Sequence, residues 1–418
     1  MSKNYRKTLA IVVGGGPAPG INGVISAATI EAINNGIKVI GIYDGFKWPV
    51  NGDSTHIKYL EIADVSRIHF MGGSIIRTSR ENPTKSPEKV KNVIKALEEL
   101  KVDYLITIGG DDTAFTSSTI ERESKGKIKI AHVPKTIDND LPLPGCQSTF
   151  GYQTARHIGT SLVQNIMEDS RTTGRWYFVI SMGRKAGHLA LGIGKAAGAT
   201  LTIIGEEFKG KYVSLKNLCD IIEGAIIKRK SMGRSDGVAV LAEGLLERFD
   251  IDELKEAGDV ELDEFDNIRM SELDLGKIVK KEIKKRFEER GQSIATPVTK
   301  DIGYELRCVS PIPFDMELTR DLGFCAVKFL LNGDSGALIN VRENKEPPIL
   351  LKNIIDPNTG KIKVRFVNTE TESYEAALHY MIRLKPEDFE DKEQLEKLAK
   401  TANLTPAEFI KKFKYLVE

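Results

Sequence analysis

The sequence predicts an α/β protein built from mainly parallel sheets covered by helices. Three observations support this fold class. Short β-branched apolar runs alternate with segments whose apolar residues repeat at helical spacing, several of these runs end in glycine-rich or acidic loops, and 418 residues are enough for two or three domains. Strands that alternate with helices form parallel sheets, because a helix supplies the crossover that joins two parallel strands.

The first part of the chain follows this alternation element by element. Ser86 and Pro87 mark the start of one helix, since serine is a good N-cap and proline suits the first turn. The expected strands are 9–13, 38–43, 104–108 and 128–133, and the expected helices are 21–34, 86–100 and 113–122.

A break at 141–145 precedes a second α/β region, because its two prolines rule out a helix or a central strand there. Beyond it we expect strands at 176–181, 201–204 and 237–242, and helices at 150–169, 188–197 and 215–228. The charged regions 246–290 and 384–418 have a helical pattern. Each is interpreted as a solvated amphipathic face, with a subunit contact as the alternative.

These boundaries predict two Rossmann-like three-layer domains. The first covers 1–140 and is completed by about 306–370, while the second covers 141–305 with a charged helical insertion at about 246–290. The remaining 371–418 is expected to form a helical C-terminal tail.

Composition excludes several classes of protein. The 60 Lys and Arg residues nearly balance 59 Asp and Glu residues, so no global field favours nucleic acid or a membrane surface. The four cysteines include no CxxC pair, which argues against a disulfide framework or a zinc site and makes the reducing cytoplasm the expected location. No apolar run approaches the roughly 18–20 residues that span a bilayer.

Glycines 14–16 and 20 belong to a loop, GGGPAPG, that joins the first strand to the first helix. Glycine lets the backbone approach a ligand closely, and the following helix offers free N–H groups to phosphate. A plain tight turn is the alternative, because the loop lacks the spacing of a dinucleotide fingerprint or of a P-loop.

Two further loops follow neighbouring strands and carry acids. In GGDDT, at 109–113, two adjacent carboxylates suit a hard cation such as Mg²⁺, although acids also favour a helix N-terminus through its dipole. PKTIDND, at 134–140, adds a cation, a hydroxyl and two more acids. A cation, an acid and a metal are the parts that phosphoryl transfer requires, and ligands bind at this edge of a parallel sheet.

These motifs, taken in order, resemble those of the phosphofructokinase family over about residues 9–340. The remaining stretches that carry the resemblance are MGR at 182–184, GVAVLAEG at 237–244 and YELR at 304–307. The family phosphorylates the 1-hydroxyl of fructose 6-phosphate with Mg²⁺. The resemblance therefore implies a donor-binding first domain, a fructose 6-phosphate-binding second domain and an active site in the cleft between them.

The resemblance also implies roles for individual residues. Asp138 matches the general base, Thr136 beside it would bind the sugar and the transferring group, and Asp111 matches the metal-binding acid. Gly15 and Arg80 match groups that contact the donor phosphates and the transferred phosphate. The expected sugar-phosphate ligands are Met182, Gly183, Arg184, Glu243, Tyr304 and Arg307, together with Arg175, which such proteins lend to the neighbouring subunit.

Two residues indicate the donor. Relatives that use ATP generally carry glycine where this chain has Asp112, and a carboxylate there adds bulk and negative charge against a nucleotide. Pyrophosphate lacks the α-phosphate and adenosine, so it still fits. Lys135 can neutralise the charge of pyrophosphate. Asp112 together with Lys135 resembles the pair found in pyrophosphate-dependent members of the family.

Several alternatives stay open at this point. One is an ATP-dependent phosphofructokinase that tolerates Asp112, and another is a kinase of the broader group that includes NAD and lipid kinases. A third is a catalytically silent regulatory subunit that binds sugar phosphate or nucleotide. The expected partners are small-molecule substrates and further copies of the chain, as a homodimer or homotetramer, because a donated Arg175 requires at least two copies.

Overall fold

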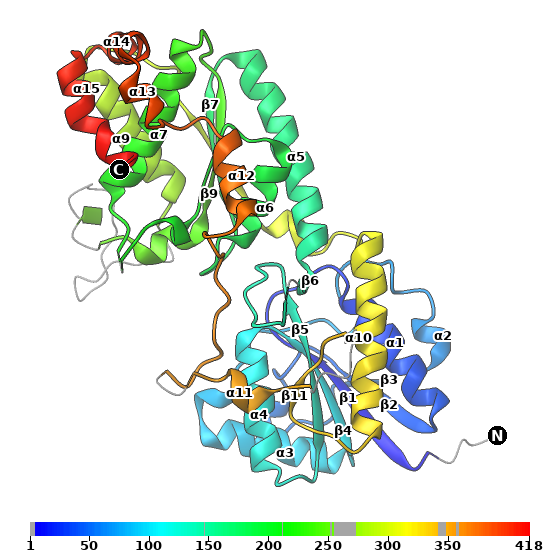
Figure 1. Cartoon of the computed structure of the whole chain (residues 1–418). Coiled ribbons are helices and arrows are strands. Elements are labelled where there is room, and N and C mark those ends of the chain that lie inside the picture. Colours follow the sequence, from blue (N-terminus) through cyan, green and yellow to red (C-terminus); the bar gives the residue numbers. More distant parts are fainter. Residues whose placement is uncertain are drawn as a thin grey trace. The chain divides into compact units, whose positions relative to one another are not determined.

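The computed structural model describes residues 5–145, 147–210, 212–250, 253–254, 273–341, 348–356 and 359–418. Its contacts divide the chain into two compact units (Figure 1). Unit 1 comprises Met1–Ala155 and Tyr304–Arg365, and unit 2 comprises Arg156–Gly303 and Phe366–Glu418. After unit 2 begins at Arg156, the chain returns to unit 1 at Tyr304, and the tail after Arg365 is part of unit 2.

Both units contain mainly parallel sheets, as the alternation of strands and helices predicts. The unit 1 sheet has eight strands, with seven in the order β12-β11-β5-β4-β1-β2-β3 and β6 paired to β5, and the unit 2 sheet has four, in the order β10-β7-β9-β8. All pairings among the described strands are parallel except β2 with β3 and β11 with β12.

The unit 1 strands are β1 Lys7–Val13, β2 Ile37–Ile42, β3 Ile57–Tyr59, β4 Tyr104–Gly109, β5 Lys129–Thr136, β6 Phe150–Gly151, β11 Ala337–Leu338 and β12 Ile349–Leu350. Its helices are α1 Ile21–Asn34, α2 Ile62–Val65, α3 Pro87–Glu99, α4 Asp111–Glu123, α10 Pro313–Leu331 and α11 Leu351–Ile354, with short 3₁₀ turns η1 Pro49–Asn51, η2 Pro83–Lys85 and η6 Tyr304–Leu306. Helix α5, Tyr152–Thr173, begins in unit 1 and continues in unit 2.

The unit 2 strands are β7 Trp176–Ser181, β8 Leu201–Ile203, β9 Gly237–Ala242 and β10 Val298–Ile302. Its helices are α6 His188–Ala197, α7 Leu215–Ser231, α9 Leu275–Glu289, α12 Glu372–Tyr380, α13 Glu387–Glu390, α14 Lys392–Thr401 and α15 Pro406–Phe413, with 3₁₀ turns η3 Gly205–Glu207, η4 Glu243–Arg248 and η7 Lys414–Leu416. The predicted insertion at 246–290 is described only at 246–250, 253–254 and 273–290, and the rest of it lies outside the described residues.

The unit 1 sheet is covered on both faces because its central strand is apolar on both sides. Leu9, Ile11 and Val13 of β1 join the core that α1 and α10 cover, whereas Ala10 and Val12 join the core on the α3 side. Successive side chains of a strand point to opposite faces, so an unbroken apolar run requires helices on both. The expected three-layer arrangement is therefore present in unit 1.

Two predicted boundaries differ from the observed ones in a way that matters for function. The helix expected from residue 113 begins at Asp111, and the strand expected to end at 133 continues to Thr136. Both acids of GGDDT thus lie in the first turn of α4, and Lys135 lies at the end of β5 rather than in a loop. The dipole of α4 favours carboxylates in this turn.

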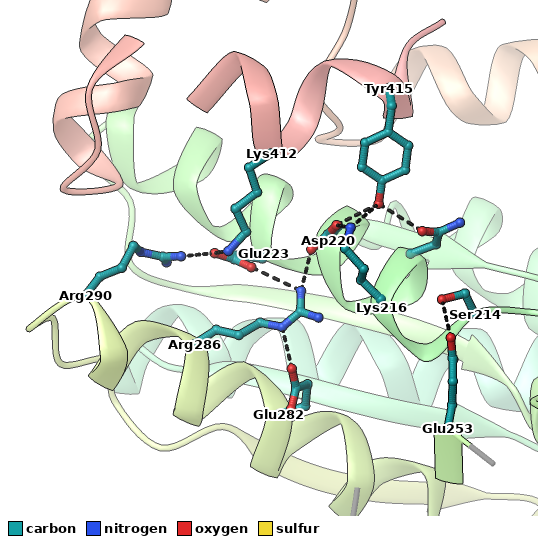
Figure 2. A network of polar contacts seen from close by, with 11 residues as sticks. Ser214, Lys216, Asp220, Glu223, Glu253, Glu282, Arg286, Arg290, Lys412 and Tyr415 are labelled. Atoms are coloured by element: carbon teal, nitrogen blue, oxygen red, sulfur yellow. Dashed lines mark hydrogen bonds and ion pairs between the residues drawn. The ribbon is translucent and has the colours of Figure 1, made fainter. Parts of the chain in front are cut away.

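The C-terminal helices pack into the core of unit 2. Leu398, Phe409 and Phe413 are fully buried with α7 and α9. A buried polar network joins the same elements (Figure 2): the Glu223 carboxylate accepts hydrogen bonds from Arg286, Arg290 and Lys412. Both Glu223 and the nearby Asp220, which accepts a hydrogen bond from Tyr415, have almost no exposed surface, so the contacts between α7 and the end of the chain are made by buried polar groups.

None of the helices among the described residues is both long and apolar enough to cross a membrane.

Candidate active site

Three sequence motifs of unit 1 lie at the carboxyl ends of adjacent strands. Strands β5, β4 and β1 are neighbours in the sheet, and their ends carry PKTIDND, GGDDT and GGGPAPG respectively. The motifs therefore meet at one edge, where ligands of open parallel sheets bind.

The glycine loop is held in an open, non-helical shape. The Gly14 N–H donates to the Ile108 carbonyl at 2.9 Å, and the Gly15 N–H donates to the Ser79 carbonyl at 2.8 Å. Gly15 has a φ of 82°, which few residues other than glycine adopt. The loop ends at Gly20, the N-cap of α1, which leaves the N–H groups of that helix directed toward the same edge.

Thr113 explains why two of the motif glycines cannot carry side chains. A Cβ on Gly14 would lie 2.4 Å from the Thr113 hydroxyl, and a Cβ on Gly109 would lie 2.3 Å from it. The close approach holds the first turn of α4 against β1 and β4. In that turn Asp111 is half-buried and Asp112 is exposed.

Lys135 reaches from the end of β5 to the glycine loop. Its side chain is buried, its Nζ donates to the Gly16 carbonyl, and this Nζ lies 3.6 Å from where a Cβ on Gly15 would be. Burial lowers the pKa of Lys135 to about 8. The Lys135 ammonium therefore loses its proton at a pH closer to neutrality than is usual for lysine.

The charges that modify this pKa identify the neighbours of Lys135. Asp138 and Asp140 raise the pKa of Lys135, whereas Arg307 and Arg80 lower it, each effect being smaller than that of burial. The structure thus brings the predicted residues Lys135, Asp138, Arg307 and Arg80 into one electrostatic environment.

Asp138 follows the strand in a tight turn. Its N–H donates to the Thr136 hydroxyl oxygen at 3.0 Å, and Asp138 is half-buried. The next residue, Asn139, has a φ of 57°, in the left-handed region. The turn therefore holds the Asp138 backbone against the Thr136 hydroxyl.

Arg307 also belongs to this loop cluster. Its guanidinium carbon lies 3.5 Å from where a Cβ on Gly16 would be, and 4.8 Å from the ring centre of Tyr304. The Tyr304 side chain is 76% exposed. Both residues lie in unit 1, whereas the other expected sugar-phosphate ligands lie in unit 2.

The second cluster lies at the carboxyl edge of the unit 2 sheet. The loop after β7 begins with Met182, whose N–H donates to the Ile302 carbonyl at 2.9 Å, and continues with Gly183, whose N–H donates to Glu243 Oε2 at 3.1 Å. Glu243 itself directly follows β9. Arg184 is exposed, and these predicted residues therefore share one loop cluster.

Glu206 holds the far end of the same loop, and sequence reasoning missed it. Its Oε1 accepts hydrogen bonds from the Gly187 N–H at 2.8 Å and from the Val367 N–H at 3.1 Å. Glu206 follows β8, so its position after an apolar run was the available signal. Nothing local in the sequence links it to residue 187.

Arg175, also in unit 2, lies apart from the unit 2 loop cluster. It is exposed and precedes β7, whereas Met182 follows the same strand. A strand of six residues is about 20 Å long, so the two residues lie at opposite edges of the sheet.

No group of three or more His, Cys, Asp or Glu side chains is gathered to hold a metal among the residues that the structure describes. Asp111 is one of the acids in the unit 1 cluster, and its half-buried carboxylate is a hard oxygen donor. Mg²⁺ commonly binds one or two carboxylates and completes its shell with water and substrate phosphates, so the donor set fits this ion.

Comparison with known proteins gives consistent matches. Residues 8–330 match the model of the phosphofructokinase family. The chain is 55% identical to a pyrophosphate–fructose 6-phosphate 1-phosphotransferase of Thermotoga maritima over 98% of this chain and 99% of that protein. It is 50% identical to an enzyme of the same name from Naegleria fowleri, over 98% of this chain and 96% of the other.

The fold also matches solved structures. The crystal structure of a pyrophosphate-dependent phosphofructokinase from Nitrosospira multiformis superposes with a TM-score of 0.66 at 16% identity, covering 95% of this chain and 92% of that one. At this identity the likeness confirms the predicted α/β fold alone.

Proposed function

Because this chain belongs to the phosphofructokinase family, we propose that it transfers a phosphoryl group from pyrophosphate to the 1-hydroxyl of fructose 6-phosphate. The products are fructose 1,6-bisphosphate and phosphate. The reaction runs readily in both directions, because pyrophosphate is a weaker phosphoryl donor than ATP.

The buried Lys135 beside the glycine loop is the observation that supports this donor most strongly. Its Nζ lies next to Gly15 and Gly16, where backbone atoms can approach phosphate oxygens. A lysine ammonium there balances the charge of a compact anion. Asp112, exposed in the same helix turn as Asp111, disfavours a longer nucleotide through like charge.

The unit 1 cluster supplies groups for the chemical step. The sugar hydroxyl oxygen attacks the nearer phosphorus, its proton passes to the Asp138 carboxylate, and the bridging P–O bond breaks with its electron pair on the leaving phosphate. Thr136 orients the reacting groups. Lys135 and Arg80, which lie in one electrostatic environment with Asp138, stabilise the negative charge that spreads over the transferring group.

Asp111 would hold Mg²⁺ together with oxygens of the donor. When bound, the ion neutralises phosphate charge and helps to orient the donor. Gly15 contributes backbone contacts to the same phosphates.

The remaining residues bind the sugar phosphate. In unit 2, Met182, Gly183, Arg184 and Glu243 form one loop cluster suited to a sugar. In unit 1, Tyr304 and Arg307 offer an aromatic face and a cation suited to a phosphate. Arg175 serves the site of a neighbouring copy in a homo-oligomer. Light scattering on the active enzyme tests that donation, since an active monomer would contradict it.

The proposal is tested by the initial rate of fructose 6-phosphate phosphorylation with Mg²⁺ and equal concentrations of either pyrophosphate or ATP. We expect a strong preference for pyrophosphate. Preference for ATP would retain the family chemistry and refute the donor assignment. If the protein binds its ligands but phosphorylates fructose 6-phosphate with neither donor, it would be a catalytically silent binding protein instead.

The pKa of Lys135 predicts a specific pH dependence. Since the pKa is lowered to about 8, the free enzyme loses this positive charge as the pH rises through that value. We therefore expect kcat/KM for pyrophosphate to fall above about pH 8, approaching tenfold per pH unit, because kcat/KM reports the ionisation of the free enzyme.

The matched variant is Lys135→Met, which has no charge to lose. Its kcat/KM for pyrophosphate is expected to be low already at neutral pH. It is also expected to lack the decline above about pH 8 that deprotonation of Lys135 causes in the parent enzyme. An alkaline decline of equal size in both proteins would assign it to ionisation of the substrate and contradict the prediction.

A further inference from the structure

The turn that contains Asp138 is held by Arg365, which donates a hydrogen bond to Asn139 from 226 positions away in the sequence. We propose that Arg365 is a positioning residue, which fixes the turn so that the Asp138 carboxylate meets the sugar hydroxyl. This inference rests on the proposed function, in which Asp138 is the base.

The guanidinium of Arg365 bonds to the turn and to the segment that follows it. Nε and Nη2 donate to the Asn139 carbonyl at 3.1 and 3.0 Å, and Nη2 also donates to the Asn139 side-chain oxygen. Nη1 donates to the Gln147 carbonyl at 2.8 Å. The Arg365 N–H adds a bond to the Asp140 carbonyl at 2.7 Å. One side chain thus joins both ends of the segment between Asn139 and Gln147.

The conformation of Asn139 shows why such support matters. Its φ of 57° lies in the left-handed region, which costs free energy for a residue with a side chain and persists where neighbours hold it. Thr149 supports the turn from the other side, since its N–H donates to Asn139 Oδ1 at 3.0 Å and its hydroxyl donates to the Thr136 carbonyl at 2.8 Å. Asp138 lies between these two anchored residues.

Arginine suits this position better than lysine would. Its planar fork offers several N–H groups in a fixed geometry, so a single side chain can bond carbonyls of two chain segments at once. The residue lies beyond 330, where the match to the family model ends. The motifs of the resemblance therefore give no indication of it.

The role can be separated from substrate binding by kinetics. Loss of a group that positions the base lowers kcat, whereas loss of a group that binds a substrate raises KM. A displacement of about 1 Å in a reacting group can cost about 10²-fold in rate. We therefore expect Arg365→Ala to lower kcat about 10–100-fold, with the KM values for pyrophosphate and fructose 6-phosphate within about threefold of those of the parent enzyme.

The experiment compares Arg365→Ala with Lys363→Ala in the full-length enzyme. Lys363 is exposed in the same segment, and the hydrogen bond recorded for it comes from its backbone N–H to the Ile354 carbonyl, so its substitution controls for the change in charge. The control is expected to keep its kcat. Added guanidinium is expected to restore part of the activity of Arg365→Ala and none in a variant that lacks the base, Asp138→Asn. Arg365→Lys, a milder change, is expected to be intermediate.

Hydrogen exchange gives a readout that does not depend on activity. Amides in a peptide spanning 136–150 are expected to exchange faster in Arg365→Ala than in the parent protein or in Lys363→Ala. If the parent protein fails to use pyrophosphate, the proposed function fails, while this exchange result still decides whether Arg365 holds the turn.

Three results would overturn the inference. The first is an unchanged kcat in Arg365→Ala, and the second is a large rise in KM with little change in kcat, which would make Arg365 a substrate ligand. The third is unchanged exchange in the 136–150 peptide. If Arg365→Ala does not fold, the same measurements on Arg365→Lys decide between these outcomes.

Discussion

Replacing Asp138 by asparagine is expected to lower kcat by about 10²–10⁴-fold, the usual contribution of a general base. The amide keeps the shape of the side chain, and the Asp138 N–H keeps its bond to the Thr136 hydroxyl. The amide cannot take the proton of the sugar hydroxyl at neutral pH. The measurement is steady-state turnover of fructose 6-phosphate and pyrophosphate, with KM determined for both substrates.

Asp140→Asn is the matched control for this substitution. Asp140 also raises the pKa of Lys135 by its negative charge, so the control removes a comparable charge without removing the base. Its kcat is expected to fall less than about tenfold, well below the effect of losing a general base. A near-normal rate in Asp138→Asn, or equal losses in the two variants, would contradict the assignment of Asp138.

Replacing Asp112 by glycine is expected to change the donor preference. A carboxylate facing like charge costs several kcal/mol, so removing it is expected to raise the ratio of kcat/KM for ATP to that for pyrophosphate by about 10²-fold. Asp112 is exposed, and its backbone makes the hydrogen bonds: its N–H donates to Asp111 Oδ1 at 2.9 Å, and its carbonyl accepts from the Thr116 hydroxyl at 2.9 Å. The substitution should therefore leave α4 folded. The measurement is kcat/KM for each donor at saturating fructose 6-phosphate.

Asp112→Asn separates charge from bulk in this prediction. If repulsion alone excludes ATP, the asparagine variant should accept ATP as well as the glycine variant does. If the size of the side chain excludes the nucleotide, only Asp112→Gly should accept it. An unchanged donor ratio in both variants would mean that Asp112 does not select the donor.

The fold class was predictable because local sequence patterns indicate which segments form strands and which form helices. In β1 an unbroken apolar run from Leu9 to Val13 required helices on both faces of a parallel sheet, and the structure has them. The edges of elements were less accurate, since α4 begins at Asp111 and β5 continues to Thr136. Such boundaries depend on pairing with neighbouring strands, which a local pattern does not contain.

Much of the candidate site was also visible in the sequence. Gly15, Asp111 and Asp138 follow adjacent strands and Lys135 lies at the end of one of them, and topology alone brings such positions to one edge of a sheet. The roles of these residues stay predictions, as does the division of substrates between the two units.

The sequence by itself therefore determined the fold class, the family and the chemistry-bearing loops, because each of these is encoded in residues close together along the chain. Only the tertiary structure decided which distant groups hold those loops. Glu206 bonds the Gly187 N–H, Arg307 lies against Gly16, and Arg365 bonds Asn139 from 226 positions away. Such contacts form only when the folded chain brings groups that are far apart in the sequence close together. The local sequence around a residue does not specify which distant group it will contact.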